Sequence, residues 1–113
     1  MTEEKVRYIM EYYSQFFTET ERLAVRHHTS TLKLADNDNP NAKKAYEHKG
    51  WLTSNKEALE LLKDGYECFA LKTANRILED NCEEVVINNC QKCGKLARTP
   101  TAKQCRHCGH DWH

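Results

Sequence analysis

Four cysteines near the C-terminus have the residue type and the spacing of a metal site. Cys90 and Cys93 form one Cys-x-x-Cys-Gly unit, Cys105 and Cys108 form a second, and eleven residues separate the two units. Four thiolates complete a tetrahedral zinc site and leave no coordination position open. The glycine after each pair suits the tight turn that presents two sulfurs to one ion, because glycine adopts positive φ angles readily. The sequence therefore predicts one structural Zn²⁺ bound by Cys90, Cys93, Cys105 and Cys108.

Other roles for these cysteines fit the sequence less well. Disulfides need an oxidising compartment, and the first residues contain no basic segment followed by an apolar run that would indicate a signal peptide. Haem attachment needs a histidine directly after the second cysteine, where Gly94 and Gly109 stand. His107, His110 and His113 could each replace a thiolate, but four cysteines already fill the tetrahedron. Iron also accepts four thiolates and stays open as the minor alternative to zinc.

The residues before the cysteines predict a mainly α fold. Apolar residues recur every three or four positions, and helix-capping residues precede several of these stretches, among them Thr2, Thr18 and Ser54. Whether the first two helices are separate or continuous is left open. We expect a small bundle of four to five helices, at about residues 3–17, 19–34, 40–50, 55–64 and 66–79.

The pattern changes after residue 81. Val85, Val86 and Ile87 are β-branched and predict a short strand that pairs with the cysteine region. Between the two cysteine pairs, residues 95–98 and 103–104 could form the arms of a β-hairpin around a turn at 99–102. We therefore expect an α-helical domain at residues 1–84 and a zinc ribbon at residues 85–113, packed against each other with almost no linker.

Charge is distributed unevenly along the chain. The formal net charge is zero, but residues 1–89 carry net −4 and residues 90–113 carry net +4. Basic side chains in a small metal module can contact phosphate, and they can equally dock onto acidic helices of the same chain. No element suited to reading bases in a groove is evident, so both uses stay open. The basic set consists of Lys92, Lys95, Arg98, Lys103 and Arg106.

Nothing in the sequence indicates an enzyme. It contains no nucleophile elbow, no phosphate-binding glycine loop and no His-Glu-x-x-His zinc motif. The adjacent His27 and His28 point to different sides of a helix, so we expect them at the surface and not as joint metal ligands. The aromatic stretch from Tyr8 to Phe17 is typical of a helical core, with a homodimer or partner surface as the alternative. No apolar stretch reaches membrane-spanning length, and we expect a cytoplasmic protein.

Residues 90–113 resemble the zinc-ribbon tails of a group of uncharacterised bacterial proteins that have a short helical N-terminal part. The resemblance implies that the zinc ligands are Cys90, Cys93, Cys105 and Cys108, and it implies no activity. Our interpretation is a non-enzymatic zinc-binding interaction module whose partner is a protein. The alternative is a nucleic-acid-binding accessory factor that uses the basic side chains of residues 90–113. The partner's identity and the oligomeric state are not predicted.

Overall fold

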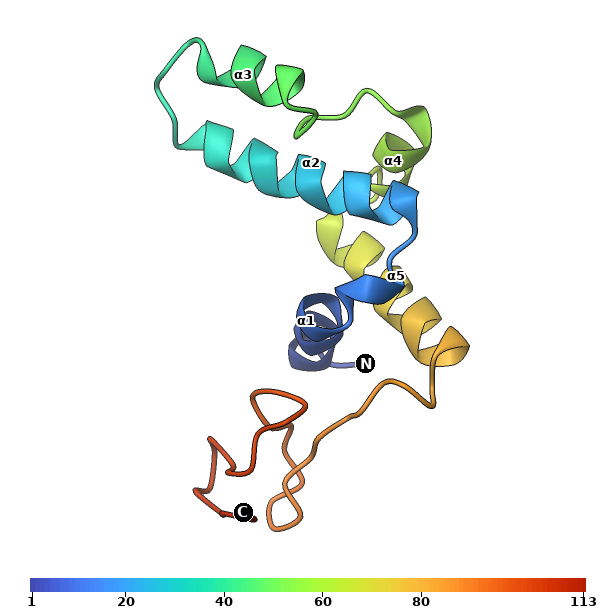
Figure 1. Ribbon diagram of the computed structural model, residues 1–113, viewed down its shortest axis with the longest axis vertical. Helices are drawn as coiled ribbons and strands as arrows, with labels where there is room; N and C mark the ends of the chain where they lie inside the picture. The colour runs from blue at the N-terminus through green and yellow to red at the C-terminus, as the bar shows by residue number, and fades with distance from the viewer. The chain divides into compact units, whose positions relative to one another are not determined.

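The chain folds mainly into helices. The computed structural model describes residues 1–113 and contains five α-helices, a short 3₁₀ helix and no extended β-strand (Figure 1). The predicted mainly α fold, with four to five helices before a four-cysteine segment, is therefore confirmed. The elements are α1 (Glu3–Tyr12), η1 (Ser14–Phe16), α2 (Glu19–Ala35), α3 (Ala42–His48), α4 (Lys56–Leu61) and α5 (Tyr66–Asp80).

Side-chain caps explain where several helices begin. Thr18 and Glu21 form a capping box: Glu21 N donates to Thr18 Oγ1 at 3.1 Å, and Thr18 N donates to Glu21 Oε1 at 2.8 Å. This cap and η1 separate α1 from α2, which answers the question that the sequence left open. The cap of α4 is Asn55 and not the predicted Ser54, because Asn55 Oδ1 accepts the Ala58 N–H at 3.1 Å.

Two compact units make up the chain. One consists of residues Phe17–Phe69, and the other joins Met1–Phe16 to Ala70–His113. The division therefore falls within α5 and just before α2. The predicted arrangement of a helical domain at 1–84 and a metal module at 85–113 stays a prediction.

In the unit Phe17–Phe69, α2 contacts both α3 and α4. Ala24, Ala42 and Ala58 are buried there, and such small side chains allow helices to approach closely. His27 Nδ1 accepts the Thr53 N–H at 3.1 Å, and the ring of His28 stacks on Tyr66 with ring centroids 3.9 Å apart. Burial, followed by the neighbouring His27, lowers the pKa of His28. Both histidines are half-buried and take part in packing, so they are less exposed than the sequence suggested.

In the other unit, the buried apolar side chains come from α1, from the end of α5 and from the segment after it. Ile9 and Ile77 are 0% exposed, and Tyr8, Tyr13 and Val85 are also buried. The burial of Tyr8 and Tyr13 agrees with the core interpretation of the aromatic stretch.

The two buried tyrosines take the place of a strand partner for residues 86–88. Val86 N donates to the Tyr13 hydroxyl at 2.8 Å, and Val86 O accepts hydrogen bonds from the hydroxyls of Tyr13, at 3.3 Å, and Tyr8. Asn88 N donates to the Tyr8 hydroxyl at 3.4 Å. The predicted strand at 85–87 is therefore wrong. The backbone groups of Val86 and Asn88 are satisfied by the hydroxyls of Tyr8 on α1 and of Tyr13, the residue that caps the end of α1, so no neighbouring strand is needed.

Tyr13→Phe tests this arrangement. Removing the hydroxyl takes away the acceptor of the Val86 N–H. Because Val86 is 52% exposed, the expected cost is that of an ordinary hydrogen bond, about 0.5–1.5 kcal/mol of folding stability. Thermal unfolding should therefore begin at a lower temperature. Tyr12→Phe is the matched control, because the hydroxyl of Tyr12 makes no hydrogen bond. Equal losses in the two variants would contradict the anchoring role of Tyr13.

Candidate metal centre

Each Cys-x-x-Cys-Gly unit forms the same tight turn. In the first, Cys90 N donates to Lys95 O at 2.8 Å and Gly94 N donates to Cys90 O at 2.8 Å. The second repeats both bonds fifteen positions later, with Cys105 N to His110 O at 2.8 Å and Gly109 N to Cys105 O at 3.0 Å. Gly94 and Gly109 have φ angles of 75° and 77°, as the turn interpretation predicted. We call residues 88–97 and 103–112 the first and second knuckle.

The predicted β-hairpin between the knuckles is absent. Antiparallel pairing consists of two isolated bridges, Asn89 with Leu96 and Gln104 with Asp111, and each lies inside one knuckle. Leu96 does not pair with a residue on the far side of the spacer, because it already forms a bridge with Asn89 in its own knuckle. The spacer is held by the side chain of Asn88, whose Nδ2 donates to Thr99 O and to Ala102 O, each at 2.9 Å.

The two turns bring four sulfur atoms together. All four lie within 4.8 Å of one another, with Cys90 and Cys108 Sγ 3.6 Å apart and Cys93 and Cys105 Sγ 3.5 Å apart. Zn–S bonds of about 2.3 Å at tetrahedral angles place sulfurs about 3.8 Å apart, so the group has the size that a zinc ion requires. A disulfide would need about 2.05 Å. The four cysteines could therefore hold a metal ion such as zinc.

Backbone donors stabilise the first thiolate of each knuckle. The amides of Cys108 and His107 donate to Cys105 Sγ at 3.4 and 3.3 Å. These hydrogen bonds outweigh the effect of burial, which would raise the pKa, and they lower the pKa of Cys105 to about 6. The amides of Cys93 and Lys92 approach Cys90 Sγ in the same way and lower its pKa. Thiolate is the form that binds metal, so the turns favour that form at Cys90 and Cys105. The Lys95 amide acts in the same direction on Cys93, but burial and the neighbouring sulfurs outweigh it and raise the pKa of Cys93 to about 11. Cys90 and Cys105 are buried, whereas Cys93 and Cys108 are exposed.

The three C-terminal histidines have contacts outside the sulfur group. The ring of His107 lies 3.6 Å from a carboxylate oxygen of Glu4, the ring of His113 contacts Asp111, and the ring of His110 lies 5.9 Å from that of Trp112. The metal-binding group that the structure assembles consists of cysteines alone.

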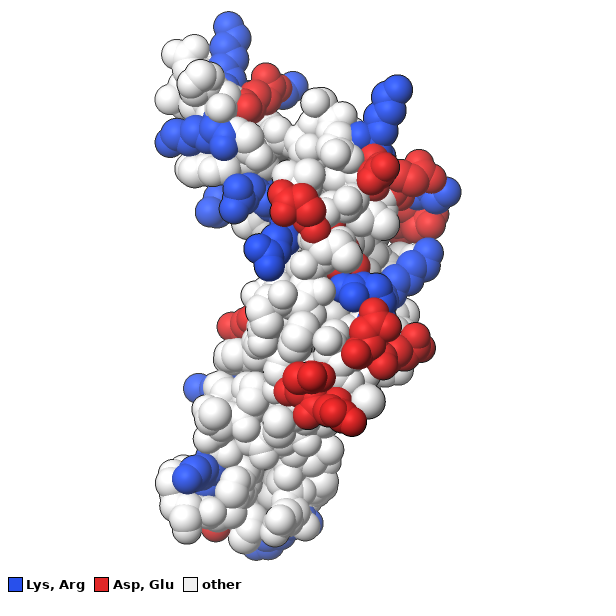
Figure 2. Space-filling view, turned by 45° about the vertical axis from the view of Figure 1, so that its right-hand side comes forward, with Lys and Arg blue, Asp and Glu red and all other residues white.

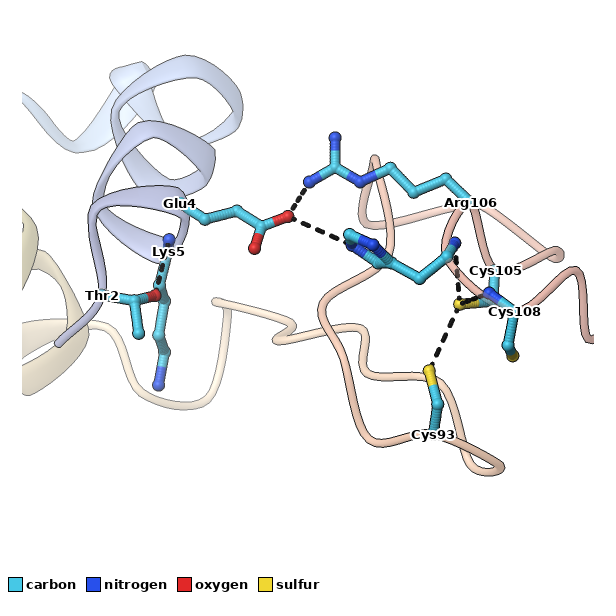
Figure 3. A network of polar contacts seen from close by, with 8 residues as sticks. Thr2, Glu4, Lys5, Cys93, Cys105, Arg106 and Cys108 are labelled. Carbon is cyan, nitrogen blue, oxygen red and sulfur yellow. Dashed lines mark hydrogen bonds and ion pairs between the residues drawn. The ribbon is translucent and has the colours of Figure 1, made fainter.

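The five basic residues divide into two groups. Arg106 forms an ion pair with Glu4 of α1, which points toward the second knuckle in Figure 3. Arg98 and Arg106 both line a cleft of about 420 Å³ whose other walls include Glu3, Glu4 and Glu11. By contrast, Lys92, Lys95 and Lys103 are exposed and form no ion pair. One part of the basic set thus faces acidic groups of α1, and the other part faces solvent.

Glu4, Tyr8 and Tyr13 support the knuckles but carry no signal of this role in the sequence. An acidic residue at position 4 is fully explained by the helix dipole, since it lies in the first turn of α1. The tyrosines fit an ordinary apolar stripe. Only the fold places them beside residues more than seventy positions away.

The fold and the site together define a mainly helical chain with a C-terminal four-cysteine group that could hold a metal ion. No protein-family model, curated protein or solved structure matches the chain. None of its helices has the length and apolar character that a membrane span requires.

Proposed function

We propose that the chain is a non-enzymatic interaction module built around one structural zinc ion, bound by Cys90, Cys93, Cys105 and Cys108. The observation that carries the proposal is the spacing of the four sulfurs, whose closest pairs at 3.5 and 3.6 Å match the edges of a zinc tetrathiolate. Zinc held by four thiolates has no open position for water, so the ion would stabilise the two knuckles and take no part in hydrolysis. Such a site suits the reducing cytoplasm, where thiols persist.

A protein is the partner that we favour. The ion pair between Arg106 and Glu4 already neutralises part of the basic set and reduces its attraction for phosphate. Elsewhere the chain exposes large apolar side chains, among them Leu59 and Leu61 on α4, each 39% exposed. Burial of these side chains against a partner protein would be favourable, because it would remove apolar surface from water.

The second candidate is a nucleic-acid-binding accessory factor. Its support is that Lys92, Lys95 and Lys103 are exposed and have no acidic partner. Arg98 and Arg106 would join them only if phosphate displaced the acidic groups of α1. Binding of this kind weakens steeply as salt rises, whereas an apolar contact does not.

Metal analysis of the purified protein tests the first part of the proposal. We expect one zinc per chain by elemental mass spectrometry and no iron. Co²⁺ substitution should produce the intense visible absorption of a tetrahedral thiolate site. A metal-free chain that also fails to take up Zn²⁺ or Co²⁺ under reducing conditions would overturn the proposal, and stoichiometric iron would replace zinc in it.

A comparison of charge and apolar variants tests the partner. The variant Lys92→Glu/Lys95→Glu/Lys103→Glu removes the solvent-facing charges, and Leu59→Glu/Leu61→Glu alters the apolar side chains of α4. The wild-type chain is expected to capture a partner protein from nuclease-treated extract at high salt. The lysine variant should still capture this protein, and the leucine variant should not. The opposite result, with nucleic acid bound by the wild type and lost by the lysine variant, would favour the second candidate.

A further inference from the structure

A groove runs along α2 in the unit Phe17–Phe69, away from the cysteine cluster. It has a volume of about 420 Å³. We call it the α2 groove, and its defining side chains are three cations and three apolar groups: Arg22, Arg26, Lys33, Phe17, Val25 and Trp51. Its remaining lining residues are the hydroxyl-bearing Thr29 and Ser30, so no acidic side chain lines it.

The three cations of the α2 groove are available to a ligand. Arg22, Arg26 and Lys33 are exposed, and none of them forms an ion pair. Helical rise places their Cα atoms about 6 Å and about 10 Å apart along the axis of α2. They therefore form a row of unpaired positive charge, although the unit as a whole contains similar numbers of acidic and basic residues. Figure 2 shows Lys and Arg side chains along one edge of the part of the molecule that holds α2 and α3.

Trp51 supplies a flat aromatic surface beside this row. It is 36% exposed, so part of the ring surface is open to a ligand. Its ring is held in place, with the ring of Tyr46 edge-on at 5.0 Å and Lys49 Nζ 4.6 Å from the ring centroid. An exposed aromatic ring with fixed orientation can stack on another ring at low entropic cost.

We propose that the α2 groove binds single-stranded nucleic acid, with phosphates at Arg22, Arg26 and Lys33 and a base stacked on Trp51. Positive charge along the backbone path combined with an aromatic platform is the general chemistry of single-strand binding. An acidic peptide is also negatively charged, but it would need an aromatic or apolar residue at the position that faces Trp51. Every nucleotide, by contrast, carries both a phosphate and a ring. The proposal is independent of the zinc site, because no cysteine and no lysine of the two knuckles lines the groove.

Salt dependence gives the first test. A fluorescein-labelled twelve-nucleotide strand of mixed sequence, as RNA and as DNA, is titrated with the zinc-loaded protein and followed by anisotropy. Three phosphate contacts on a single strand predict a slope of about −2 for log affinity against log salt, or about a 15-fold loss between 50 and 200 mM. Absence of binding to either strand at low salt overturns the proposal.

Variants then locate the site. Arg22→Gln/Arg26→Gln/Lys33→Gln should weaken binding at least tenfold and flatten the salt dependence, and Trp51→Ala should weaken it roughly tenfold through lost stacking. Lys44→Gln/Lys56→Gln/Lys72→Gln is the matched control: it removes three exposed charges that form no ion pair and lie outside the groove, and it should leave affinity unchanged. Equal losses in both triple variants would indicate non-specific attraction and overturn the groove assignment. If affinity were lost only in the knuckle variant Lys92→Glu/Lys95→Glu/Lys103→Glu, the nucleic acid would bind at the knuckles and the groove assignment would be wrong.

Fluorescence provides a direct readout of the stacked ring. The chain has two tryptophans, so Trp112→Phe leaves Trp51 as the single reporter. Quenching of Trp51 by the unlabelled strand, and no quenching by an equally charged Asp/Leu peptide, is the expected result. Quenching by the peptide alone would overturn the proposal in favour of a protein ligand. Circular dichroism and zinc content, measured for every variant, confirm that the fold is intact.

Discussion

Cys93→Ser is expected to release the metal and unfold the two knuckles. Cys93 is exposed, so exchanging its sulfur for oxygen removes a ligand with little loss of packing. Zinc affinity should fall by more than the roughly 10–100-fold that loss of an outer-shell partner costs. The knuckles contain only isolated β-bridges, so their folding should depend on the metal, which contributes about 10–16 kcal/mol in comparable small zinc peptides.

Zinc stoichiometry and amide hydrogen exchange measure this outcome. Residues 88–112 should lose protection in Cys93→Ser, and a strong chelator should produce the same loss in the wild-type protein. Cys82→Ser is the control, since Cys82 is also exposed and lies outside the sulfur group. A Cys93→Ser protein with one bound zinc and wild-type protection would show that the ligand assignment is wrong.

Ile77→Ala is expected to cause one of the largest losses of stability among changes outside the cysteines. Ile77 is 0% exposed near the end of α5, so truncating it removes buried apolar contacts and leaves a cavity. Substitutions of this kind cost about 2–5 kcal/mol. The melting temperature of the zinc-loaded protein should fall by roughly 10 °C or more, at about 4–8 °C per kcal/mol for a domain of this size.

Leu71→Ala is the matched comparison for Ile77→Ala. Leu71 lies on the same helix and is 38% exposed, so its truncation should change the melting temperature by a few degrees at most. Zinc stoichiometry should remain one per chain in both variants, because neither side chain is a ligand. Similar melting temperatures for the two variants would contradict the core position of Ile77.

The helices could be predicted because their signals are local. Apolar periodicity lies within each segment, and the capping box of Thr18 and Glu21 involves residues three positions apart. Exact starts were less predictable. Ser54 and Asn55 are both good capping residues, and the choice of Asn55 depends on the path by which the chain enters α4.

The strand at 85–87 and the hairpin between the cysteine pairs were predicted wrongly for a common reason. β-branched residues favour an extended backbone but do not determine what pairs with it. The backbone of residues 86–88 forms hydrogen bonds with the hydroxyls of Tyr8 and Tyr13. The residues that flank each cysteine pair form a β-bridge with each other inside one knuckle. Both outcomes depend on which groups lie nearby after folding.

The sequence by itself determined the four-cysteine group, since two Cys-x-x-Cys-Gly turns joined by a short spacer can bring their sulfurs to one point almost regardless of the rest of the chain. Tertiary structure decided which charges remain free. Arg106 and Lys103 look equivalent in the sequence, yet Arg106 meets Glu4 across about one hundred residues and Lys103 meets no acid. Tertiary structure also placed Trp51 beside Arg22, Arg26 and Lys33. The physical reason is that ion pairs and grooves depend on distances between remote segments, which residue spacing alone does not specify.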